Sequence, residues 1–137
     1  MNLTLHTDGQ IVQTDFVLSP GHVGFKDTLH GGILSTVLDE VMSWACAVST
    51  KRFAYCAELT IRFARPGRPG DPMLAKAELV ANRRGKIFDA KGEIRTRDGA
   101  LIATGSGKYM PLKESDLAQM ATELMVDPRD LFGASAS

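Results

Sequence analysis

One nearly apolar segment, residues 32 to about 50, constrains the fold of this 137-residue chain more than any other part. It predicts one long helix, whose apolar side chains surround most of the axis: Ile33, Leu34, Val37, Leu38, Val41, Met42, Trp44, Ala45 and Val48. A helix that is apolar on most sides is a buried helix. Its polar side chains share one arc of about 140°. They are Ser35, Thr36, Asp39, Glu40 and Ser43.

The sequence around this helix indicates strands. Residues 11–18 are rich in β-branched side chains and end at Ser-Pro-Gly, and a glycine-punctuated loop then leads into the helix. Beyond the helix, alternation with a period of two predicts four antiparallel strands in a meander, over residues 54–64, 73–82, 87–96 and 101–110. Tight turns are expected at Gly85 and at the Asp-Gly pair that ends at Gly99.

A five-stranded sheet that curls around one buried helix is an α+β fold. The polar stripe of that helix must then face water or a shared surface. The simplest partner is the same stripe of a second copy, which predicts a homodimer. We expect a single domain over residues 1–137, with its core at about 10–112 and a C-terminal helix or tail at 113–137.

The composition argues against several classes of function. Sixteen basic and sixteen acidic residues balance, so a general nucleic-acid binder is not expected. No apolar run reaches the ~18 residues of a membrane span, and three histidines argue against a metal site. The N-terminus lacks the basic and apolar regions of a signal peptide. Two cysteines, of which Cys46 lies in an apolar run, favour a reducing, cytoplasmic location.

The motif at the start of the helix carries a resemblance. His30-Gly31-Gly32 is followed by Asp39, nine residues after the histidine, in "LHGGILSTVLDEVMSWAC". With "LTIRFARPGRPGDPMLAKAELV" and "GALIATGSGKYMPL" further along, the chain resembles PaaI-like acyl-coenzyme A thioesterases over about residues 16–112. Many relatives have an asparagine and a glycine where this chain has Gly24 and Asp27, so no substrate-placing asparagine is carried over.

The resemblance implies a fold, an activity and an assembly. The fold is the hotdog fold, a long central helix wrapped by a curved antiparallel sheet of five to six strands. The activity is hydrolysis of an acyl-coenzyme A (acyl-CoA) to the free acid and CoA, without a cofactor. The assembly is a homodimer or a homotetramer built as a dimer of dimers, and the active site is shared between two subunits.

The same motif predicts the chemistry of the site. A helix N-terminus offers unpaired N–H groups, and glycines let a carbonyl approach them, so the backbone N–H of Gly31 or Gly32 is expected to form the oxyanion site. His30 would position the loop or donate a second hydrogen bond. By resemblance, Asp39 is the general base or the nucleophile, and the sequence does not separate the two roles. Ser43, one turn later, is expected to hold the water.

Two further groups are expected to bind substrate. CoA carries phosphates, and the cations of one predicted hairpin lie where relatives often contact the nucleotide end: Arg83, Arg84 and Lys86, with Gly85 in the turn. Cys56 lies near the place where some relatives have a hydroxyl residue.

Each interpretation has a plainer alternative. His30 can be a loop cap, Ser43 a packing serine, and the cations of the hairpin a solvated surface. Glu40 is the alternative acid because it lies on the same arc as Asp39. Two other functions also remain open. One is a non-catalytic acyl-CoA-binding domain, and the other is a hotdog hydratase or dehydratase.

Overall fold

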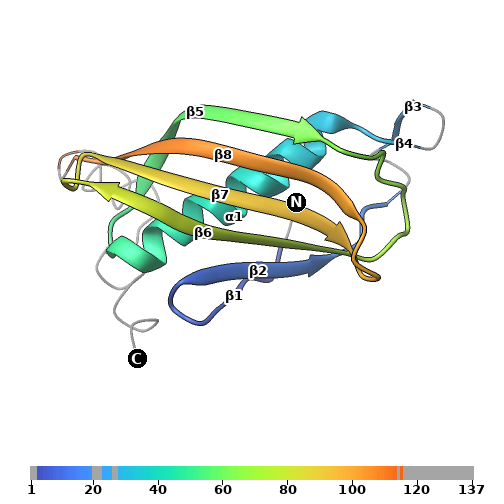
Figure 1. Ribbon diagram of the computed structural model, residues 1–137, viewed down its shortest axis with the longest axis horizontal. Helices are drawn as coiled ribbons and strands as arrows, with labels where there is room; N and C mark the ends of the chain where they lie inside the picture. Colours follow the sequence, from blue (N-terminus) through green and yellow to red (C-terminus); the bar gives the residue numbers. More distant parts are fainter. Residues whose placement is uncertain (1–2, 20–22, 26–27, 114, 116–137) are drawn as a thin grey trace.

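The computed structural model describes residues 3–19, 23–25, 28–113 and 115. Within these residues the chain forms one helix and eight strands (Figure 1). They are β1 (His6–Thr7), β2 (Ile11–Phe16), β3 (Val23–Phe25), β4 (Thr28–Leu29), α1 (Gly31–Thr50), β5 (Ala54–Phe63), β6 (Met73–Arg83), β7 (Ile87–Thr96) and β8 (Leu101–Pro111). The helix and the four strands after it agree with the prediction to within one residue at each end. The short strands β1, β3 and β4 were not predicted.

Six of the strands form one antiparallel sheet in the order β1-β2-β6-β7-β8-β5, and β3 pairs with β4 separately. The predicted α+β class with a sheet of five to six strands is confirmed. The predicted meander is wrong for its first strand, because β5 pairs with β8 and not with β6. The linker over residues 64–72 is long enough to cross the end of the sheet, whereas β6, β7 and β8 are joined by tight turns. Strand β5 therefore lies at an edge of the sheet.

Helix α1 lies across one face of this sheet (Figure 1). Its sheet-facing side chains are fully or almost fully buried: Leu34, Val37, Leu38, Val41, Met42, Ala45 and Cys46. Glycines in the sheet allow the helix to come close. A Cβ built on Gly92 would lie 3.1 Å from Met42 Cγ, and one on Gly107 would lie 3.0 Å from Met42 Cε. The backbone of α1 is thus held firmly over β7 and β8.

By length and composition alone, α1 is also apolar enough to cross a membrane, with a mean hydropathy of 1.2. This differs from the expectation that no apolar run is long enough to span a membrane. Core helices of soluble proteins meet the same criterion, and the apolar side of α1 packs on the sheet. The apolar composition is therefore explained by the core.

A β-bulge interrupts β5 between Cys56 and Glu58. Past the bulge, Leu59 and Ile61 pack against the core, and before it Ala54 does. After the bulge the odd-numbered side chains face the helix, whereas before the bulge the even-numbered side chains do. As a result Cys56 faces the helix, which the regular alternation of the sequence did not predict.

The predicted C-terminal helix or tail at 113–137 lies outside the described residues, apart from Lys113 and Ser115. Its structure stays a prediction, as does the extent of the domain.

Candidate active site

Asp39 lies near the middle of α1, and its carboxylate is bound by a side chain of the sheet. The hydroxyl of Tyr109, on β8, donates a hydrogen bond to Asp39 Oδ1 at 2.8 Å. The same hydroxyl lies 3.5 Å from the backbone carbonyl oxygen of Asp39. Tyr109 is fully buried and Asp39 half-buried. Because the acceptor is a carboxylate, this is a charge-assisted hydrogen bond between helix and sheet.

Cys56 and Ser43 border this pair. Cys56 is the residue directly opposite Tyr109 in the β5–β8 ladder. Burial raises the pKa of the Cys56 thiol, and the charge of Asp39 raises it further. Burial also raises the pKa of Tyr109 far above its usual range, Asp39 adds to this effect, and a hydrogen bond with Ser43 opposes it. The structure therefore brings Asp39, Ser43 and Cys56 together around a tyrosine.

The N-terminus of α1 is a second centre. His30 is the N-cap, and its Nδ1 accepts a hydrogen bond from the Gly32 N–H at 2.9 Å. His30 is thus a helix cap in the structure. Its side chain engages the Gly32 N–H, one of the two candidate oxyanion donors. No hydrogen bond between described residues uses the N–H of Gly31. Gly31 lies eight residues before Asp39, or about 12 Å along the helix axis.

A hollow of about 290 Å³ opens beside Gly31. It is lined by Gly31, Leu34 and residues 63–67. Gly31 lies against Phe63, since a Cβ built on this glycine would be 3.0 Å from Phe63 Cζ. Phe63 is the last residue of β5 and half of its surface is exposed. The start of α1 and the end of β5 therefore form one apolar-walled hollow.

The predicted tight turn between β6 and β7 is confirmed, with Arg84 and Gly85 both at positive φ. Arg83 Nε forms an ion pair with Asp89 at 2.7 Å. Arg84 and Lys86 make no ion pair with any described residue. Arg52, just after α1, donates from Nη1 to the Gly85 carbonyl at 3.0 Å. Arg84 and Lys86 therefore have no ion-pair partner among the described residues, and Arg52 lies next to the same turn.

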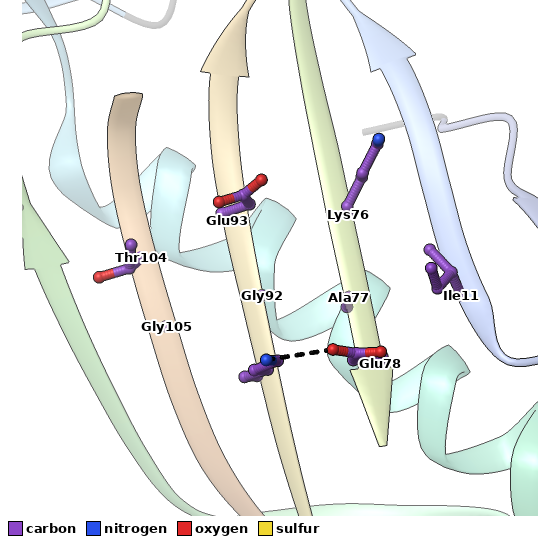
Figure 2. Close-up of a pocket in the computed structure, with 9 residues that line it drawn as sticks. Ile11, Lys76, Ala77, Glu78, Gly92, Glu93, Thr104 and Gly105 are labelled. Carbon is purple, nitrogen blue, oxygen red and sulfur yellow. Dashed lines mark ion pairs between the residues drawn. The ribbon is translucent and has the colours of Figure 1, made fainter. Parts of the chain in front are cut away.

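The larger hollow, of about 360 Å³, lies on the other face of the sheet. Figure 2 shows the charged side chains of Lys76, Glu78 and Glu93 on the face of the sheet away from α1. Lys91 Nζ, which also lines this hollow, forms an ion pair with Glu78 Oε1 at 3.2 Å. Neither Asp39 nor the Gly-Gly pair lines it. The larger hollow is therefore separate from the predicted site.

Two residues of these centres were missed by the sequence analysis. Tyr109 was treated only as part of a strand, although alternation along β8 would place it on the buried face. Arg52 lies outside the predicted cation cluster, and nothing in the sequence signals its contact with Gly85. Glu40, the alternative acid, is exposed and accepts a hydrogen bond from Trp44 Nε1 at 3.3 Å. It does not face Tyr109.

The chain matches the model of a known protein family. The family model described as "Thioesterase superfamily" matches residues 26–103, which include both Gly31 and Asp39. The chain belongs to the thioesterase superfamily. This confirms the family predicted from the His-Gly-Gly motif and its aspartate.

Several solved structures have the same fold. The E. coli PaaI protein from the phenylacetic acid degradation operon matches with a TM-score of 0.74 and 21% identity, over 81% of this chain and 80% of that one. A Streptococcus mutans protein bound to acetyl-CoA matches with a TM-score of 0.76 and 16% identity, over 82% and 90%. A hypothetical thioesterase of Streptococcus pneumoniae with coenzyme A matches with a TM-score of 0.74 and 16% identity, over 81% and 86%. The fold is the hotdog fold of PaaI.

Proposed function

We propose that this protein hydrolyses the thioester bond of an acyl-CoA to give the free acid and CoA. One observation carries the proposal. This chain belongs to the thioesterase superfamily. Its Asp39, which follows the Gly-Gly motif, is half-buried in an apolar helix and accepts a hydrogen bond from the buried Tyr109. A carboxylate at such a place costs folding free energy unless it is hydrogen-bonded. A role in catalysis would explain why the chain has a carboxylate there. Two proteins of the same fold were solved with acetyl-CoA or coenzyme A bound, which supports the substrate class.

The chemistry requires an activated water and a stabilised oxyanion. Asp39 takes a proton from water, and the resulting hydroxide adds to the thioester carbonyl carbon. The negative charge moves to the carbonyl oxygen, where a backbone N–H stabilises it; one such donor is typically worth about 10²–10³ in rate. The C–S bond then breaks, and the CoA thiolate takes up the proton. If Asp39 instead attacks directly, an anhydride forms and water hydrolyses it to the same products.

The Gly31 N–H is the better oxyanion donor of the two glycines, because the Gly32 N–H already binds His30. Within one subunit, however, Asp39 and Gly31 are about 12 Å apart along α1. One subunit therefore cannot supply both groups to one carbonyl. A second copy of the chain must bring its own aspartate to the glycine.

Strand β5 offers the way to do this. It is a ten-residue edge strand whose outer edge is unpaired within the described part of the chain. A long unpaired edge is a template for another strand. If β5 pairs with its own copy about a two-fold axis, the start of one strand lies beside the end of the other. Cys56, which faces Asp39, would then adjoin the partner subunit's Phe63, which contacts the partner subunit's Gly31.

The turn between β6 and β7 supports binding of the nucleotide end of CoA. Arg84 and Lys86 are exposed, and Arg52 adds a third positive charge next to the turn. Phosphate groups are recognised by such donors. Arg83 contributes less, because Asp89 already engages it.

A panel of acyl-CoA esters, followed through the ultraviolet absorbance of the thioester, tests the proposal. We expect turnover with at least one ester, and a fall of about 10² or more for Asp39→Asn at an unchanged melting temperature. Glu40→Gln is the matched control and should keep most of the activity, because Glu40 is exposed and bound to Trp44. A reversed result would move the acid to Glu40. Binding of CoA esters without turnover would mean a binding domain, and water addition to an unsaturated acyl group would mean a hydratase.

A further inference from the structure

The partner of the Asp39 carboxylate has no assigned role in the reaction. We propose that Tyr109 is the positioning residue of Asp39: its hydroxyl holds Oδ1 and leaves Oδ2 to act on the water or the thioester. This inference rests on the proposed hydrolysis. It adds a residue from a different element, 70 positions away in the chain.

Tyr109 is placed rigidly enough for this task. It lies on β8, an inner strand of the sheet, directly opposite Cys56 on one side and Phe88 on the other. The tyrosine is fully buried, and so is Phe88. Pairing with two strands fixes the backbone of Tyr109, and the packed core restricts the rotamers of its side chain. Its distance of 2.8 Å to Asp39 Oδ1 therefore sets the direction of the carboxylate.

The hydroxyl is also a permanent donor. Burial raises the pKa of Tyr109 well above its usual range, and Asp39 raises it further. The phenol is therefore protonated at neutral pH and can donate its hydrogen bond there. Since an ionised carboxylate has no proton to give, the direction of the hydrogen bond is fixed from tyrosine to aspartate. Oδ1 is thereby engaged by the phenol, and Oδ2 is the oxygen that the proposal assigns to the proton of the water.

A plain packing role would need only the ring, and phenylalanine would supply it. Tyr109→Phe keeps the ring and removes the hydroxyl. A loss of orientation in the reacting group costs up to about 10² in rate. We therefore expect kcat to fall by about 10- to 100-fold while KM changes by less than about twofold. Tyr55→Phe is the matched control, because its hydroxyl is exposed and its hydrogen-bond partner among the described residues is Met110 Sδ, at 3.5 Å. It should leave kcat unchanged.

A second measurement does not depend on catalysis. The chain has two tyrosines, so Tyr55→Phe leaves Tyr109 as the only source of the phenolate absorbance on alkaline titration. In that background Tyr109 should resist ionisation well beyond the ordinary value of about 10. Adding Asp39→Asn removes the negative charge and should move the titration to lower pH, because Asp39 is one cause of the raised pKa.

The two experiments distinguish failure of the positioning role from failure of the proposed hydrolysis. A Tyr109→Phe variant with wild-type kcat would overturn the positioning role and leave the hydrolysis intact. Titration of Tyr109 in the ordinary range, or no movement on Asp39→Asn, would overturn the hydrogen bond on which the role depends. Absence of turnover in the wild type would instead refute the proposed function, and the titration would still report whether Tyr109 holds Asp39.

Discussion

Gly31 and Phe63 are in such close contact that a Cβ on the glycine would lie 3.0 Å from the ring atom Cζ. The contact joins the first residue of α1 to the last residue of β5. Any larger residue at this position therefore requires the Phe63 ring to move. A test of its role in catalysis has to remove the ring first.

A double-mutant cycle does this. Gly31→Ala in the wild type should lower both the melting temperature and kcat, because the methyl group meets Phe63. In a Phe63→Ala background the stability cost should largely disappear, while a fall in kcat of about 10² should remain if the thioester carbonyl approaches this glycine. Thermal unfolding and steady-state kinetics of the four proteins check it. Equal kcat for Phe63→Ala with and without Gly31→Ala would make the glycine purely structural.

Mixing of two inactive variants tests whether the site is shared. Both variants are made in the Phe63→Ala background, which gives a larger side chain at Gly31 room. Asp39→Asn lacks the carboxylate and Gly31→Val blocks the carbonyl, so each variant alone should be nearly inactive. In a mixed dimer one site would carry both defects and the other neither. After denaturation and refolding together, activity should return to about a quarter of that of the Phe63→Ala parent, since half of the dimers would be mixed. No recovery, or an active monomer in sedimentation, would place the whole site in one subunit.

The cations of the β6–β7 turn should affect only substrates that carry the nucleotide. Arg84 has φ 57°, so asparagine is a suitable replacement that tolerates this backbone. Arg84→Asn with Lys86→Gln should raise KM for CoA esters by about 3- to 10-fold. KM for a short thioester without the nucleotide should not change. Arg97→Gln, in the hairpin at the opposite end of β7, is the control; an equal effect from it would indicate general electrostatics.

Thiol labelling reports on the surroundings of Asp39. Cys46 is buried, and burial raises its pKa to about 12, so it should not react until the protein unfolds. Cys56 is exposed, but burial of its sulfur and the charge of Asp39 raise its pKa. Its alkylation should therefore be slow at neutral pH and quicken as pH rises. Asp39→Asn removes one of these causes and should speed labelling at neutral pH; an unchanged rate would place Asp39 away from the thiol.

Local patterns were sufficient to predict much of the fold. The apolar run of α1 and the period of two in β6, β7 and β8 reflect burial against one face, which sequence spacing reports directly. Asp39 was identified because a carboxylate in an apolar helix needs an explanation. The position of β5 was predicted wrongly, because a linker of nine residues allows this strand to pair at the far edge of the sheet as well as beside β6.

The partners of the site residues were harder to predict. Tyr109 and Asp39 are 70 residues apart, and no spacing rule relates a strand residue to a helix residue at that distance. The contact of Arg52 with Gly85, 33 residues away, is likewise a product of the folded chain. The site as a whole depends on how the helix crosses the sheet.

The bulge in β5 has a consequence for comparing this chain with its relatives. It leaves Ala57 as an extra residue between the Cys56–Tyr109 pair and the Glu58–Lys108 pair. One extra residue reverses which face of the sheet the preceding side chains point to, and for this reason Cys56 lies near Asp39. In a regular strand Ala57 would face Asp39 and Cys56 would point to the far side of the sheet. An alignment that moves the extra residue by a single place therefore assigns the wrong side chain to the neighbourhood of Asp39. Equivalent positions on this strand should be counted from the bulge toward the N-terminus.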